Sequence, residues 1–241
     1  MSAISKRIRK ALGKNFLAHI EDSSQWHRNL IDAIRRSQPF GGVSGPNRKF
    51  EVSHIRDQIL HKLYFEDIED RHGRIAEAHR QTFKWIYCDP EAKNRRWTSF
   101  VNWLEKDHGI YWITGKPGSG KPTLMKYLHS NPATVQHLER WASPHSLAMT
   151  SFFFWNSGSK MQMSHTGLLQ TLLFKALSKH PSLIPKVFPK RWEVCSLFGE
   201  DTRCWGWSEL TKAIELLVNE QSVALRFCFF IDGLDEFDGD H

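Results

Sequence analysis

The sequence predicts an α/β domain built on a parallel sheet and preceded by a helical segment. Apolar runs typical of buried strands alternate with amphipathic helices, a glycine-rich loop joins the first run to a helix, and the last run ends in acidic residues. Strands that alternate with helices favour a parallel sheet covered by helices. At 241 residues the chain is long enough for one full core with a helical appendage.

The net charge of +7 lies entirely in residues 1–50, which hold ten basic and three acidic side chains. The rest of the chain is balanced, so its charge gives no case for nucleic-acid binding. Residues 1–36 predict a basic helix, which is solvated, touches a membrane surface or a partner, or serves as an organelle transit peptide. Residues 37–50 are rich in Gly, Pro and Ser and predict a flexible linker.

Four cysteines lack C-x-x-C spacing and predict free thiols in a reducing, cytoplasmic compartment, with a Cys195–Cys204 pair as the alternative. No apolar run reaches the roughly 18 residues of a membrane span. The thirteen histidines show neither HExxH nor zinc-ligand spacing, so no metal centre is predicted from them. We interpret His72 and His79 as solvated histidines on one helix face.

Residues 51–108 predict a helical lead-in. Ile55, Ile59 and Leu63 mark one apolar helix face, and Asp89-Pro90 breaks the helical pattern. A short helix around Trp103 follows. Residues 109–241 are then predicted to form the α/β domain.

Three apolar runs of this domain predict strands, at Gly109–Thr114, Leu147–Asn156 and Arg226–Asp232. The periodicity predicts helices at residues 121–129, closed by Asn131-Pro132, at residues 167–179, and at residues 210–218 with Ser208 as the N-cap.

The run GIYWITGKPGSGKPTLMKYL (residues 109–128) has the strand, loop and helix of a phosphate-binding loop, for which the consensus is G-x-x-x-x-G-K-[ST]. Gly115, Gly118 and Gly120 let the backbone approach an anion, and Lys121 adds a charge. The position that should be Ser or Thr is Pro122. The alternative is an ordinary glycine turn between a strand and a helix.

The run FCFFIDGLDEF (residues 227–237) places Asp232 at the end of a strand, where a carboxylate typically holds Mg²⁺. Glu236 is the better candidate for positioning or deprotonating an attacking water, and Asp235 is the second. The alternative is an acidic turn after a buried strand.

Together with FFFWNSG (residues 152–158) and the lead-in from Leu63 to Tyr87, these runs resemble the NACHT-type STAND ATPases, above all the fungal NOD-like receptors and the nephrocystin-like N-terminal domain. The resemblance spans about residues 55–241. It implies a P-loop NTPase three-layer sandwich in which ATP or GTP closes a signalling switch that drives self-association with protein partners. The chain lacks an N-K-x-D motif, which favours ATP.

The resemblance also implies residue roles. Asp232 would serve Mg²⁺, and Glu236 with Asp235 would serve hydrolysis. The phosphates would be held by Gly115, Lys116, Pro117, Gly118, Ser119, Gly120, Lys121 and Thr123.

Two departures from the family pattern change this expectation. Pro122 supplies neither a hydroxyl for Mg²⁺ nor a backbone N–H, and Thr123 cannot replace it because one helix position rotates a side chain by about 100°. We therefore expect nucleotide binding with weak Mg²⁺ dependence and little hydrolysis. The family's strand order 5-1-4-3-2 places a strand that follows Asp232 between the first and last predicted strands, so we expect an incomplete sheet in a truncated domain.

Two other functions remain open. One is a non-catalytic protein-interaction module derived from an NTPase. The other is a P-loop small-molecule kinase, although the sequence carries no basic lid.

Overall fold

The computed structural model describes residues 46–79, 82–89, 97–106 and 109–237, with side chains from residue 51 onward. The described residues fall into two compact units. One combines the described part of Met1–Ile59 with Pro189–Arg203, and the other combines Leu60–Phe188 with the described part of Cys204–His241. The predicted basic helix of residues 1–36 lies outside the described residues.

The larger unit contains a two-stranded parallel sheet. Strand β1 (Ser146–Phe153) pairs with β2 (Leu225–Asp232) in a register that joins Ser146 to Leu225 and Phe153 to Asp232. Both strands correspond to apolar runs of the sequence, so the prediction of a mixed α/β fold with a parallel sheet is confirmed.

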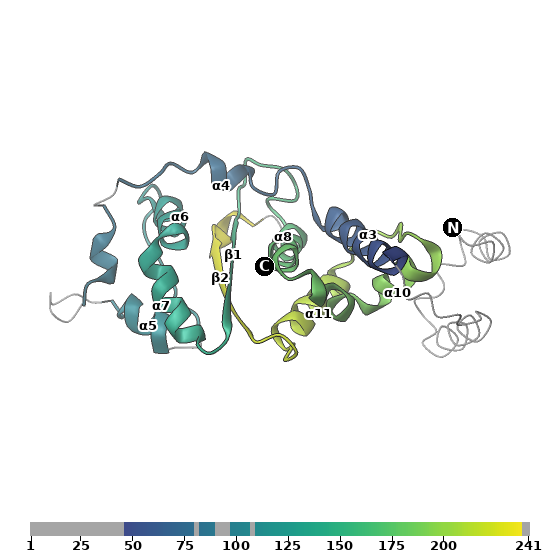
Figure 1. The fold of residues 1–241 in the computed structure, drawn as a ribbon. Coiled ribbons are helices and arrows are strands. Elements are labelled where there is room, and N and C mark those ends of the chain that lie inside the picture. Colours follow the sequence, from purple (N-terminus) through teal and green to yellow (C-terminus); the bar gives the residue numbers. More distant parts are fainter. Residues whose placement is uncertain (1–45, 80–81, 90–96, 107–108, 238–241) are drawn as a thin grey trace. The chain divides into compact units, whose positions relative to one another are not determined.

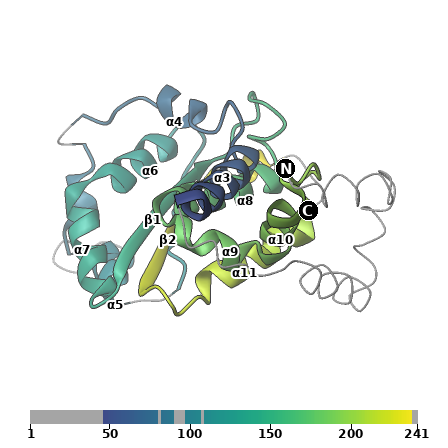
Figure 2. The same ribbon diagram turned by 45° about the vertical axis from the view of Figure 1, so that its right-hand side comes forward.

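Helices cover both faces of this sheet (Figures 1 and 2). Alternate residues of a strand point to opposite faces. Cys228 and Phe230 of β2 therefore pack on one side with Leu124 and Leu128 of α6 (Lys121–Ser130). The opposite face packs Phe152 of β1 against Leu172 of α8 (His165–Lys179), and the partly buried Ile214 of α11 (Trp207–Val218) joins this cluster. Complete burial of each large apolar side chain contributes roughly 1.5–3 kcal/mol.

The predicted strand at Gly109–Thr114 is wrong, because this stretch adopts no regular secondary structure. Ile110 is 86% exposed and Trp112 is 66% exposed, whereas Tyr111 and Ile113 pack against the core beneath α6. The segment alternates as a strand would, but a strand also needs a hydrogen-bonded neighbour. No described segment pairs with it.

The helical lead-in is wrong for residues 75–79, which form no helix between α4 and η2. The predicted helices at residues 121–129, 167–179 and 210–218 are present, with two corrections. Asn131-Pro132 ends α6 and also starts a further helix, α7 (Pro132–Ala142), because the Asn131 side chain accepts a hydrogen bond from the Ala133 amide at 2.8 Å. The N-cap of α11 is Gly206 and not Ser208. The shorter elements are α4 (Asp70–Arg74), η2 (Lys84–Tyr87), α5 (Phe100–Lys106), η4 (Pro181–Leu183), α9 (Ile184–Val187) and η5 (Leu234–Glu236).

The smaller unit contains most of α3 (Pro46–Leu63) and the helix α10 (Pro189–Phe198), which the periodicity did not predict. Because α3 begins at Pro46, the predicted linker is wrong for residues 46–50. The side-chain amide of Gln58 donates to the Gly199 carbonyl at 3.0 Å and ties α3 to the end of α10.

A buried ion pair forms the centre of the smaller unit. Arg191 and Asp201 are 1% and 3% exposed, and Arg191 Nη1 lies 3.3 Å from Asp201 Oδ2. Arg203 Nη2 donates to the same carboxylate oxygen at 2.7 Å. Burial alone would raise the pKa of Asp201, but the hydrogen bonds from Arg203 and the charges of both arginines together hold it below its usual value.

The described cysteines are all free thiols, as their spacing predicts, and they are Cys88, Cys195, Cys204 and Cys228. None of the helices within the described ranges has the length and apolar character that crossing a bilayer demands.

Candidate functional site

The glycine-rich loop folds back on itself just before α6. Gly118 and Gly120 have φ angles of +74° and +80°, a left-handed conformation that favours glycine. The Ser119 amide donates to the Lys116 carbonyl at 3.1 Å and closes the turn. A Cβ atom at Gly115 would lie 2.7 Å from the Ser119 hydroxyl oxygen, a close contact that rotation of the Ser119 side chain would relieve.

Lys121 closes the loop with its own side chain. Its Nζ donates to the Gly115 carbonyl at 3.0 Å and lies 3.5 Å from the Lys116 carbonyl. The loop residues between Gly115 and Ser119 are exposed, including Pro117, and Thr123 is half-buried in the first turn of α6. The ammonium group is thus held directly over an exposed backbone turn.

Pro122 fits the first turn of α6 without disrupting it. The first turn of a helix has no intrahelical acceptors for its N–H groups, so a proline is tolerated there. The helix starts normally, with the Leu124 amide bonded to the Gly120 carbonyl at 2.9 Å. The proline nevertheless removes one backbone donor from the end of the helix that faces the loop.

The acidic turn follows β2. The Asp232 side chain is 8% exposed, and Gly233 takes a left-handed φ of +74°. A Cβ at Gly233 would lie 3.1 Å from the Phe154 carbonyl oxygen, so glycine lets the turn pass close to β1. Glu236 Oε2 accepts a hydrogen bond from the Asn156 amide at 3.0 Å, whereas Asp235 is exposed.

Electrostatics link the loop to the acidic turn. Burial raises the pKa of Asp232 to about 6, the negative charge of Glu236 adds to this, and the charges of Arg71 and Lys121 oppose it. The Lys121 ammonium group therefore lies close enough to the Asp232 carboxyl for their charges to interact. The structure brings the glycine-rich loop and the carboxylates of the last strand to one end of the sheet, where both strands finish near α4 (Figure 1).

Sequence reasoning missed two side chains at this end, Arg71 and Trp155. The Arg71 guanidinium lies 5.4 Å from the centroid of the Trp155 ring, and that of Arg74 lies 5.0 Å from it. Such cation–π contacts hold the guanidinium groups in place. The Nε of Arg71 is buried with no hydrogen-bond partner among the described residues. No motif marks Arg71, because its place beside Asp232 depends on how α4 packs on β1.

The raised pKa of Asp232 predicts a stability cost at neutral pH. A folded-state pKa above the unfolded value means that the folded state holds its proton more tightly, so stability falls as pH rises from about 4 to about 6. In buffer free of divalent cations, we expect Asp232→Asn to raise the free energy of unfolding at pH 7.5 by up to about 3 kcal/mol. Urea denaturation at pH 4 and pH 7.5 measures the change, which vanishes at the lower pH.

Asp235→Asn is the matched control, because Asp235 is exposed and its replacement should change stability little. A less stable Asp232→Asn variant at pH 7.5 would show that the charged carboxylate has stabilising partners in the folded state, contrary to this prediction.

Comparison with known proteins gives one family. A family model described as "Nephrocystin 3, N-terminal" matches residues 81–241, about two thirds of the chain. No curated protein and no solved structure matches the chain. The match includes the glycine-rich loop, both strands and the acidic turn, and it confirms the nephrocystin-like part of the resemblance. The chain therefore belongs to the nephrocystin 3 N-terminal family.

Proposed function

We propose that this chain is a nucleotide-binding switch module of the NACHT/STAND type, which holds the phosphates of ATP, or less readily GTP, in the loop from Gly115 to Lys121. The observation that carries the proposal is the pairing of a left-handed glycine loop, closed by Lys121, with the buried carboxylate of Asp232. The proposal extends to a P-loop sandwich as the fold of the larger unit.

The residues present fit the phosphate groups. Backbone N–H groups at a helix N-terminus and a nearby ammonium group are the usual ligands of a phosphate chain. A bound phosphate would compete with the Gly115 carbonyl for Lys121. Arg71 would add a second cation, because its guanidinium acts on the same end of the sheet and its Nε has no partner among the described residues.

The carboxylates fit Mg²⁺ only in part. Mg²⁺ is usually bound through one or two carboxylates together with substrate phosphates and water, and Asp232 could supply one such ligand. When bound, the ion would neutralise phosphate charge. Asp232 carries an unfavourable buried charge at neutral pH, which a cation would relieve. Pro122 offers no hydroxyl as a second protein ligand, so we propose weak Mg²⁺ binding and little hydrolysis.

The roles of the remaining carboxylates follow from their surroundings. Glu236 is anchored by the Asn156 amide, which fixes its carboxylate beside Asp232, so we propose it as the group that orients or deprotonates water. Asp235 is exposed and is the weaker candidate.

The Pro122→Ser variant tests this proposal. We expect the wild-type chain to bind ATP with similar affinity in Mg²⁺ and in EDTA, whereas Pro122→Ser gains Mg²⁺-dependent affinity and hydrolyses ATP at least about tenfold faster, the effect of roughly 1.4 kcal/mol. The added hydroxyl and the restored N–H provide the physical reason. Isothermal titration calorimetry and phosphate release measure the two quantities.

Pro132→Ser is the matched control, since it makes the same substitution in the first turn of α7, outside the glycine-rich loop. It should leave both quantities unchanged. Equal hydrolysis by the wild-type chain and Pro122→Ser would show that Pro122 does not limit the chemistry.

A second candidate function is a non-catalytic interaction module. The exposed Ile110 and Trp112 favour it, because large apolar side chains that lie exposed next to each other are typical of contact surfaces. Absence of ATP binding, together with self-association that Trp112→Ser abolishes in light-scattering measurements, would support this function over the first.

A further inference from the structure

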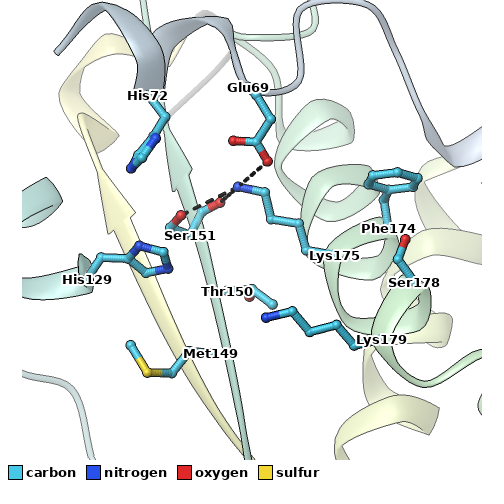
Figure 3. Close-up of a pocket in the computed structure, with 10 residues that line it drawn as sticks. All are labelled: Glu69, His72, His129, Met149, Thr150, Ser151, Phe174, Lys175, Ser178 and Lys179. Carbon is cyan, nitrogen blue, oxygen red and sulfur yellow. Dashed lines mark hydrogen bonds and ion pairs between the residues drawn. The ribbon is translucent and has the colours of Figure 1, made fainter. Parts of the chain in front are cut away.

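A pocket lies along β1, between α8 and the side chains of His72 and His129 (Figure 3). Its volume is about 330 Å³, and it lies entirely within the larger unit. The glycine-rich loop and the acidic turn contribute none of its lining residues. A volume of this size is at the lower end of the range for small-molecule sites.

Three residues that line this pocket each carry a buried polar atom with no hydrogen-bond partner among the described residues. These atoms are the Thr150 hydroxyl oxygen, His72 Nε2 and His129 Nδ1. Thr150 is only 1% exposed. Buried polar groups in folded proteins are nearly always paired, and an unpaired one costs about 1–3 kcal/mol. Three such atoms around one cavity indicate a polar ligand.

The charge of the pocket is positive. Lys175 Nζ lies 3.1 Å from Glu69 Oε1 and donates to the Ser151 carbonyl at 2.9 Å, so its charge is compensated. Lys179 lies one turn further along α8, and the described residues give it neither an ion pair nor a hydrogen bond. Figure 3 shows both lysines extending from α8 into the pocket. Among the described lining residues, Lys179 therefore remains as an uncompensated cation at the pocket mouth.

Both histidines are neutral at pH 7. Burial first, then the charges of Lys175, His72 and Lys179, lower the pKa of His129 to about 4, against a smaller opposing effect of Glu69. Burial and the positive charge of Lys126 likewise lower the pKa of His72, whereas Glu69 and Glu77 act in the opposite direction. A neutral imidazole can donate or accept a hydrogen bond.

Apolar surface completes the lining. Phe174 from α8 and Met149 from β1 also line the cavity, and in Figure 3 they lie on opposite sides of the two lysines. A ligand that satisfies the whole pocket needs an apolar body for these two side chains and an acceptor for Lys179 and Thr150. The uncompensated charge of Lys179 matches a single negative charge, because Glu69 and Lys175 compensate each other.

We propose that this pocket binds a small organic monocarboxylate, whose carboxylate accepts from Lys179 and the Thr150 hydroxyl and whose apolar body packs against Phe174 and Met149. The site is separate from the glycine-rich loop and does not rest on nucleotide binding. Benzoate is a suitable probe because it joins one carboxylate to a flat apolar ring.

The test is a titration of the wild-type chain with benzoate, followed through the imidazole signals of His72 and His129 by NMR. We expect saturable shifts of both histidines, and binding of benzamide, the neutral isostere, at least about tenfold weaker, the effect of one charge-assisted contact. Lys179→Met should weaken benzoate at least tenfold, whereas Lys160→Met, at an exposed lysine outside the pocket, should not change it.

Two further variants separate binding in this pocket from binding at the glycine-rich loop and from a loss of folding. Lys121→Met should leave benzoate affinity unchanged, because the loop is not part of this site. Thr150→Val should weaken benzoate and leave the melting temperature of the ligand-free protein unchanged or higher, because it deletes an unpaired buried hydroxyl. The proposal is overturned if benzamide binds as tightly as benzoate, if the histidine signals do not move, or if Lys179→Met and Lys160→Met behave alike.

Discussion

Replacing Lys121 with methionine is expected to weaken ATP binding by roughly 10- to 100-fold, because a hydrogen bond to a charged group contributes about 1.5–3 kcal/mol. The Lys121 ammonium group already lies over the loop, 3.0 Å from the Gly115 carbonyl, so little reordering is needed for it to meet a phosphate. Methionine keeps much of the side-chain length and removes only the charge and its donors. Isothermal titration calorimetry with ATP measures the change.

Lys116→Met is the matched control. Lys116 belongs to the same loop and is exposed, and its carbonyl, rather than its side chain, contacts Lys121. We expect its replacement to reduce affinity by less than threefold, through a weaker general attraction for anions. Equal losses in the two variants would mean that the loop acts only as a positive patch, contrary to the proposed geometry.

Replacing Asp201 with asparagine is expected to lower the free energy of unfolding by roughly 3 kcal/mol, because removing one partner of a buried ion pair is strongly destabilising. Arg191 is only 1% exposed and would lose its contact with the Asp201 carboxylate, while Arg203 would bring a second positive charge close to it. Urea denaturation followed by circular dichroism measures the loss. Hydrogen exchange of residues 189–203 locates it in the smaller unit.

The effect of Asp201→Asn should depend on pH. The pKa of Asp201 is held below its usual value, so its contribution is present above about pH 4 and is lost as pH falls through the folded-state pKa. Asp57→Asn, at an exposed position of α3, is the control and should change stability by less than about 0.5 kcal/mol. A similar loss of stability in both variants would show that the buried ion pair contributes no more to the free energy of unfolding than an exposed aspartate does.

The local sequence pattern predicted β1 and β2 correctly, but it also predicted a strand at Gly109–Thr114 that does not form. The runs at Leu147–Asn156 and Arg226–Asp232 became β1 and β2 because each is apolar and each has the other as a neighbour. Gly109–Thr114 has a similar composition but no partner among the described residues. Strand formation depends on pairing between distant segments, and a local pattern does not contain that information.

Helix prediction failed where one signal has two meanings. Asn131-Pro132 predicts the end of a helix, yet asparagine is also a strong N-cap and proline is favoured in a first turn. The same dipeptide therefore closes α6 and opens α7.

The candidate site was predictable where it depends on consecutive residues. The left-handed glycines, Lys121 and the acid at the end of β2 all belong to short sequence motifs. In the structure, Lys121 is close enough to Asp232 for its charge to lower the pKa of that carboxyl. Arg71 and His72 were not predictable, because their roles arise when α4 packs against β1. The prediction that His72 and His79 are solvated on one helix face is wrong, because His72 is partly buried against Phe153 and His129 and α4 ends at Arg74, before His79.

The central claim is that the glycine loop holds the phosphates of a nucleotide, and the backbone amides of that loop test it most directly. In an ATP titration of the ¹⁵N-labelled wild-type chain, we predict that the amide signals of Gly118, Gly120 and Lys121 shift together and saturate with one affinity. Adenosine, which lacks phosphates, should leave them in place. If these amides do not move at millimolar ATP, or move equally with adenosine, the chain does not bind nucleotide phosphates through this loop.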